Sequence, residues 1–156
     1  MTAEGSLITD EMRALIGVEN PPRRFEVDRT GIRMFARSVG YTDPVFYDPE
    51  EAKRRGYRDI IAPPGYLGTP VFNPATDAGP RQRPGGLARA LNAGNEYEYY
   101  DVITAGDVLE ARSKIANMVE RSGSIGQMLI TTTETLYTRL SDGKAVAKAV
   151  NTGISY

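Results

Sequence analysis

The chain has 156 residues, a formal net charge of −1 and 40% hydrophobic residues, which suits one globular domain with an ordinary core. This charge gives no basic surface for a nucleic-acid backbone, and no segment has the roughly 20 apolar residues that a membrane helix requires. The absence of His and Cys excludes disulfides, thiolate nucleophiles and the commonest general base near neutral pH. We therefore expect one domain over residues 1–156, located in the cytoplasm, with no nucleic-acid or membrane partner.

Two helices are predicted in the first 40 residues. Apolar residues at helical spacing indicate a short helix that includes residues 12–16. The same periodicity indicates an amphipathic helix over residues 32–39. Asp28 and Thr30 are suitable N-caps for this second helix, and Gly40 is a suitable residue to end it.

A third, short helix is predicted directly after the stretch YTDPVFYDP. Asp48 is a suitable N-cap, Pro49 fits the first helical position, and Gly56 follows a basic last turn. Residues 62–90 are rich in Gly and Pro, which excludes one long regular helix there. This composition predicts a short helix over residues 66–72, a loop, and one further helical turn over residues 87–91.

From residue 95 onward the pattern is typical of strands. Alternation over residues 108–120 places Leu109 and Val119 on one predicted face and Glu120 on the other. Strands are also predicted over residues 128–138 and 144–156, joined by a turn at Ser-Asp-Gly. Helices followed by long antiparallel strands predict an α+β fold, in which a curved sheet lies over helical segments.

The stretch YTDPVFYDP, the segment IIAPP and the order of the elements together resemble the MaoC-like hot-dog family. The resemblance is to the N-terminal dehydratase type found in two-domain or heteromeric hydratases, and it covers nearly the whole chain. It implies a single hot-dog fold, a curved antiparallel sheet wrapped around a central helix. We expect Pro70 and the neighbouring glycines to shorten that helix.

In active members of this family, a loop of pattern D-x-N-P-(aliphatic)-H-x-D supplies the Asp and His that position water against an enoyl thioester. The same frame here reads YTDPVFYD, so Tyr41 stands at the Asp position and Phe46 at the His position. A family-like LHGGQEYEY segment reads LNAGNEYEY, with Asn92 at its His position. Phenylalanine cannot transfer a proton, and a tyrosine of ordinary pKa, about 10, is a weak base. The resemblance therefore implies a pseudo-hydratase half that pairs with an active hot-dog chain and helps to shape its acyl tunnel.

Ten residues are candidates for the site. Tyr41 and Asp43 are the candidate acid/base pair for a chain that is active alone, although aspartates in such turns commonly cap helices. The candidate pocket residues are Phe46, Tyr47, Pro63, Pro64, Tyr66, Asn92, Arg81 and Arg83. The two arginines belong to a basic cluster that fits either the phosphates of CoA or a solvated loop. Tyr97, Tyr99 and Tyr100 fit either an aromatic interface or an ordinary strand.

Three functions are compatible with the sequence. The first is a non-catalytic, substrate-shaping subunit of a heteromeric enoyl-CoA hydratase or 3-hydroxyacyl-thioester dehydratase, whose small hot-dog partner carries the catalytic Asp and His. The expected short helix suggests a bulky acyl group, for example a ring-bearing or steroid-like one. The second is an autonomous homodimeric lyase or isomerase that uses Tyr41 and Asp43. The third, less favoured, is a binding module for acyl thioesters. We expect no cofactor in any case, with an acyl-CoA or acyl-carrier-protein thioester as substrate.

Overall fold

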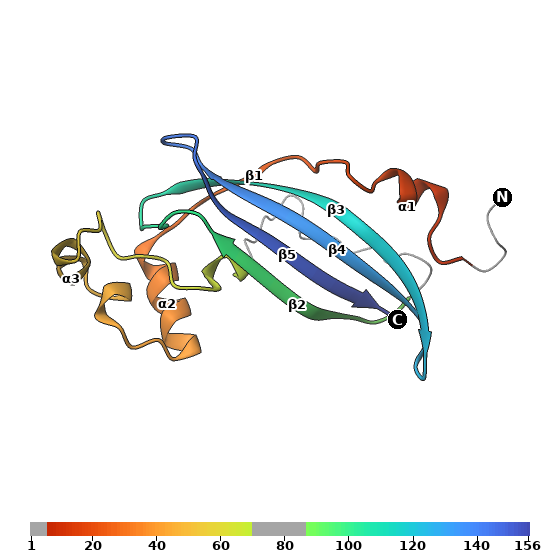
Figure 1. Cartoon of the computed structure of the whole chain (residues 1–156). Helices are drawn as coiled ribbons and strands as arrows, with labels where there is room; N and C mark the ends of the chain where they lie inside the picture. The colour runs from red at the N-terminus through yellow and green to blue at the C-terminus, as the bar shows by residue number, and fades with distance from the viewer. Residues whose placement is uncertain (1–5, 70–86) are drawn as a thin grey trace.

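The computed structural model describes residues 6–69 and 87–156, and within them a single antiparallel sheet of five strands. The strands are β1 (Arg23–Glu26), β2 (Ala90–Tyr99), β3 (Val108–Gly123), β4 (Gly126–Arg139) and β5 (Ala145–Ser155). Their order across the sheet is β1-β3-β4-β5-β2. Figure 1 shows that the long strands curve together, with α2 and α3 gathered near one end of the sheet. The predicted α+β class and the curved antiparallel sheet are confirmed.

The helices form where local signals in the sequence agree. They are α1 (Asp10–Ala14), α2 (Arg29–Val39) and α3 (Pro49–Arg54), with 3-10 turns η1 (Pro44–Phe46) and η2 (Tyr66–Gly68). The Asp28 side chain caps α2 by accepting from the Gly31 N–H, and Gly40 ends that helix with a φ of 80°. The Asp48 side chain caps α3 in the same way. None of the helices in the described part of the chain is long and apolar enough to cross a membrane.

Two of the predicted helical segments lie in the Gly/Pro-rich region. The turn predicted over residues 87–91 is wrong, because β2 already begins at Ala90 and Arg89 exchanges two backbone hydrogen bonds with Tyr156. The helix predicted over residues 66–72 is present only as η2, as far as Thr69. The rest of that helix, and with it the predicted shortening of the central helix at Pro70, lies outside the described residues.

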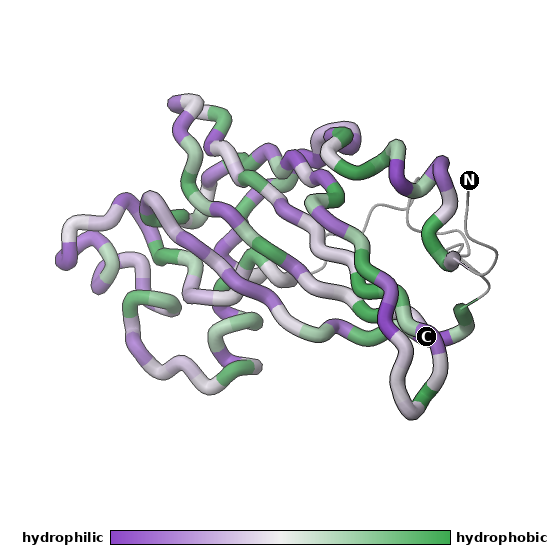
Figure 2. The backbone as a smooth tube through the Cα atoms, turned by 45° about the vertical axis from the view of Figure 1, so that its right-hand side comes forward, coloured by the Kyte–Doolittle hydropathy of each residue, from purple (hydrophilic) through white to green (hydrophobic). Residues whose placement is uncertain are grey.

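A β-bulge in β3 changes which side chains share a face of the sheet. Ile115 pairs with Thr133 and Asn117 pairs with Thr132, so that Ala116 is an extra residue. Beyond it, Val119 lies opposite Ile130, and Glu120 lies opposite the buried Leu129. The alternation predicted over residues 108–120 is therefore wrong after residue 115. Figure 2 shows hydrophobic and hydrophilic residues interspersed along the strands.

The core lies between the helical segments and one face of the sheet, called here the inner face. The helical side contributes Val27, Ile32, Val45, Ala52, Ile60, Tyr66 and Leu67, and the sheet side contributes Ile103, Ala105, Leu109, Tyr137, Val146, Ala147 and Ala149. The opposite, outer face carries charged side chains, among them Lys114, Glu134 and Lys148. This arrangement leaves the YTDPVFYDP loop at the end of the sheet where α2 and α3 pack.

Candidate functional site

The loop of residues 41–48 is shaped by hydrogen bonds to aspartate. Asp43 precedes η1, and its Oδ1 accepts a hydrogen bond from the Val45 N–H at 3.0 Å. Its Oδ2 lies 3.0 Å from Arg55 Nη1. The Val45 N–H, followed by the Arg55 guanidinium, lowers the pKa of Asp43. These contacts make the Asp43 carboxylate a weaker base than a free aspartate.

The two positions at which the resemblance places catalytic residues carry aromatic rings that face each other. The ring centroids of Tyr41 and Phe46 are 5.5 Å apart, with the rings inclined at 48°. The Tyr47 hydroxyl donates a hydrogen bond to the Tyr41 carbonyl, and Arg33 Nε donates to the Tyr47 carbonyl at 3.0 Å. Tyr47 therefore stabilises the loop through hydrogen bonds of its hydroxyl and its carbonyl. Its predicted place in the pocket wall is not seen in the cavity described next.

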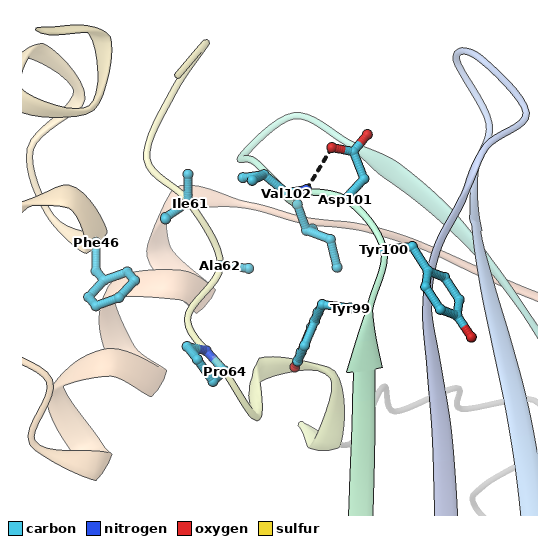
Figure 3. Close-up of a pocket in the computed structure, with 9 residues that line it drawn as sticks. Phe46, Ile61, Ala62, Pro64, Tyr99, Tyr100, Asp101 and Val102 are labelled. Carbon is cyan, nitrogen blue, oxygen red and sulfur yellow. Dashed lines mark hydrogen bonds between the residues drawn. The ribbon is translucent and has the colours of Figure 1, made fainter. Parts of the chain in front are cut away.

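A cavity of about 520 Å³ opens between this loop and the end of β2. It is lined by Phe46, Ile61, Ala62, Pro64, Tyr99, Tyr100, Asp101, Val102 and Ile103. Figure 3 shows Phe46 on one side, Ala62 between, and Tyr99 and Val102 on the other side. The lining is mainly aliphatic and aromatic, which suits an apolar ligand group better than a reacting water.

Asp101 is the charged residue of this lining, and its contacts hold it as a carboxylate. Its Oδ1 accepts from the Val102 N–H at 2.8 Å, and its Oδ2 pairs with Arg139 Nη2 at 2.5 Å. The Arg139 side chain, followed by the Val102 N–H, lowers the pKa of Asp101. Asp101 is thus an anchored anion at the rim and a poor general base.

The other predicted pocket residues are dispersed. Pro64 lines the cavity, whereas Pro63 is fully buried and Tyr66 packs edge-on against Phe35 in the core. Asn92 lies in a bulge of β2, where its Oδ1 accepts from the Gly94 N–H and from Asn151 Nδ2. Arg81 and Arg83 lie outside the described residues. The structure therefore brings Phe46 and Pro64 together in one cavity.

Tyrosines on the inner face of the sheet contact η2 and the residue before it. The Tyr99 hydroxyl oxygen accepts from the Gly65 N–H at 3.0 Å, and the Tyr137 hydroxyl lies 3.5 Å from the Leu67 carbonyl oxygen. A Cβ at Gly68 would lie only 2.5 Å from the Tyr97 hydroxyl. Sequence reasoning missed the contribution of Tyr137, because it comes from a strand far along the chain.

Burial gives Tyr137 a testable pH dependence. Burial first, and then the neighbouring Tyr97 and Tyr99 phenols, raise the pKa of Tyr137 to about 12. The unfolded chain releases this proton near pH 10 and the folded chain retains it, so stability falls as pH rises from about 10 to 12. The fall amounts to about 2–3 kcal/mol in the free energy of unfolding.

Urea unfolding of the wild type and Tyr137→Phe at pH 9 and pH 11.5 measures this contribution. We expect the variant to lose less stability than the wild type over this interval. Equal losses in the two proteins would show that Tyr137 titrates like an ordinary exposed phenol.

The site offers little for a metal or for acid/base chemistry. Within residues 6–69 and 87–156, no group of three or more His, Cys, Asp and Glu side chains could hold a metal ion. Asp43 in the loop and Asp101 in the cavity lining are both engaged by backbone N–H groups and arginine, and Asp48 caps α3. What remains is an apolar cavity beside an aromatic pair.

Comparison with known proteins gives both a sequence family and a fold. The family described as "FAS1-like, dehydratase domain region" matches residues 14–149. A UPF0336 protein of Streptomyces avermitilis is 33% identical over 114 residues, covering 72% of this chain and 76% of that protein. A UPF0336 protein of Saccharopolyspora erythraea is 34% identical over 115 residues, covering 72% and 73%.

Solved structures resemble the whole described fold. The HadBC (3R-hydroxyacyl-ACP dehydratase) complex of Mycobacterium tuberculosis has a chain with a TM-score of 0.71 and 28% identity, covering 94% of this chain and 98% of that one. The ChsH1–ChsH2 complex of the same organism gives 0.71 at 16% identity, covering 88% of each chain. The R-hydratase PhaJ1 of Pseudomonas aeruginosa gives 0.65 at 16%, covering 90% and 81%. The latter two support the fold alone, and all three agree with the hot-dog architecture expected from the sequence.

Proposed function

The chain belongs to the FAS1-like dehydratase domain region family, and from this premise we propose that it is a non-catalytic, substrate-shaping subunit of a heteromeric hydratase or dehydratase. The enzyme acts on enoyl or 3-hydroxyacyl thioesters of CoA or acyl carrier protein. The observation that carries the proposal is the contact between Tyr41 and Phe46 at the positions where active relatives have Asp and His. Reversible addition of water to an enoyl thioester needs a general acid and a general base within hydrogen-bond reach, and Phe46 can be neither, so this ring pair lacks at least one of the two groups.

A second hot-dog chain that carries the catalytic Asp and His is the proposed partner. The HadBC and ChsH1–ChsH2 structures, both complexes, support this choice. The sheet supports it too, because β2 is at the end of the strand order and has no strand neighbour on its outer side within the described chain. An unpaired edge of this length is a site for pairing with another strand.

The role proposed for the cavity is to form part of the wall around the acyl group. Its lining by Phe46, Ile61 and Ala62 favours contact with hydrocarbon over contact with water. We extend the proposal to a bulky acyl group, ring-bearing or steroid-like, because Pro70 and the neighbouring glycines favour a short central helix, which would leave a wider pocket. A complex that accepts short linear acyl groups and rejects larger ones would remove this extension.

Two substitutions test whether the loop takes part in proton transfer. Tyr41→Phe keeps the ring contact and Asp43→Asn keeps a capping side chain, so both variants should fold. In the complex with the partner we expect each to retain activity within about twofold of the wild type, since removing a true acid or base costs about 10²–10⁴-fold. A loss of that size in kcat would favour the autonomous enzyme, with Tyr41 and Asp43 as its acid/base pair.

A further inference from the structure

The two edges of the sheet differ in how they are covered. On one side, β1 and the segment that precedes it run along β3, where the Gly17 N–H donates to the Ile115 carbonyl and the Asn20 N–H to the Ser113 carbonyl, each at 2.8 Å. The other edge is β2, whose residues are almost all exposed. Within the described chain, the β2 edge presents a long row of backbone groups with no strand beside it.

Two carboxylates lie on the outer face of this open edge. Glu96 is opposite Val150, and Glu98 is opposite Lys148 on β5. Among the described residues, Glu96 makes no side-chain hydrogen bond or ion pair. Glu98 accepts a hydrogen bond from the Tyr100 hydroxyl at 3.1 Å. No cation of the described chain forms an ion pair with either carboxylate.

On the inner strands of the sheet, an outer-face carboxylate does have basic partners. Lys148 Nζ lies 3.1 Å from Glu134 Oε1, and Lys114 Nζ lies 3.9 Å from Glu134 Oε2. Across the outer face, acidic side chains are thus flanked by basic ones on neighbouring strands. Lys148 is the cation nearest to Glu98 on β5, and it is already engaged with Glu134. At the β2 edge, Glu98 lies opposite Lys148 without forming an ion pair with it, and within residues 6–69 and 87–156 no strand beyond β2 supplies a cation to Glu96 or Glu98.

Self-pairing of β2 would place like charges together. Two copies that keep their inner faces on one side must align outer-face residues with outer-face residues. Antiparallel registers centred on the regular part of β2 then set Glu96 against Glu96, Glu96 against Glu98, or Glu98 against Glu98. Like charges directly opposite each other destabilise a strand pair, and opposite charges stabilise it.

We infer that Glu96 and Glu98 make the β2 edge selective for a partner strand with Lys or Arg on its outer face, and that they disfavour pairing with a second copy of this chain. That the natural partner is a hot-dog chain rests on the proposed function. The charge preference rests on the placement of the two carboxylates. Association at this edge is therefore heteromeric, because the two carboxylates repel their copies and attract a basic partner strand.

A charge swap within this one protein tests the preference. The probe is the double variant Glu96→Lys/Glu98→Lys, mixed in equal amounts with the wild type at low ionic strength. The dissociation constants of the mixture and of each protein alone are measured by sedimentation velocity, with a mass tag on one component. We expect the mixed dimer to be at least about tenfold tighter than either self-dimer, since the swap changes two or more cross-strand charge pairs.

Salt and a matched control sharpen the test. Added NaCl should weaken the mixed dimer and strengthen wild-type self-association, because screening reduces attraction and repulsion alike. The control Glu11→Lys/Glu50→Lys changes the net charge equally, on exposed positions of α1 and α3, and should give no mixed dimer tighter than the wild-type dimer.

Two results would overturn the inference. One is a wild-type self-dimer as tight as the mixed dimer, and the other is the absence of any mixed dimer, which would show that this edge does not pair. Neither result contradicts the proposed function if the chain increases the activity of a hot-dog protein that carries the catalytic Asp and His. Loss of that activation with an intact charge preference would contradict the proposed function, and the inferred charge selectivity of the β2 edge would stand.

Discussion

Asp107→Ala is expected to lower the free energy of unfolding by about 3 kcal/mol, a large share of the stability of a domain of this size. The Asp107 side chain is 1% exposed and sits where the chain enters β3. It accepts hydrogen bonds from Arg58 Nη2 at 2.6 Å and from the Thr104 N–H at 2.9 Å, and Arg139 Nη1 lies 3.8 Å away. Alanine would leave the buried Thr104 N–H without its acceptor and would remove one carboxylate from the half-buried Arg139 guanidinium.

Urea unfolding followed by circular dichroism measures this effect, with Asp142→Ala as the matched control. Asp142 pairs with the same Arg139, but its side chain is 36% exposed. An exposed pair contributes about 0–1 kcal/mol, so the control should lose far less stability. Equal losses in the two variants would show that the burial of Asp107 adds nothing to the free energy of unfolding.

The sequence predicts best those features that depend on neighbouring residues. Asp28, Asp48 and Gly40 fix helix ends by contacts within one turn, so their roles follow from residue type and spacing. The YTDPVFYDP loop was recognisable for a similar reason, since its two aromatic substitutions fall within one short frame. That Tyr41 and Phe46 contact each other is a consequence of the η1 turn between them.

Features that join distant segments could not be predicted. The bulge at Ala116 is set by pairing with β4, and it moves Glu120 to the inner face, where its Oε1 accepts from the Ile8 N–H. The helical turn expected at residues 87–91 is replaced by strand because the chain there pairs with β5. The cavity brings Phe46 together with residues 99–103, which are distant in the sequence and meet only in the folded chain. In each case tertiary pairing overrides a local pattern.

Asp43 shows how a local pattern can point to two roles. Its position in the loop made it a candidate base, and the same position made it a candidate cap. The structure shows the capping contact with Val45 and the ion pair with Arg55. Both contacts favour the charged form and so reduce basicity, which argues for a loop that retains its shape without proton transfer.

The second large effect concerns activity, and it shows whether this chain supports catalysis without performing it. The measurement is hydration of a series of enoyl-CoA thioesters by this protein alone, by a hot-dog protein that retains the D-x-N-P-x-H pattern, and by the two together. We expect no turnover above background for this chain alone, and for the mixture a rate at least about 10²-fold higher, the usual contribution of an acid/base residue. Turnover by this chain alone at the rate of the mixture would contradict the account.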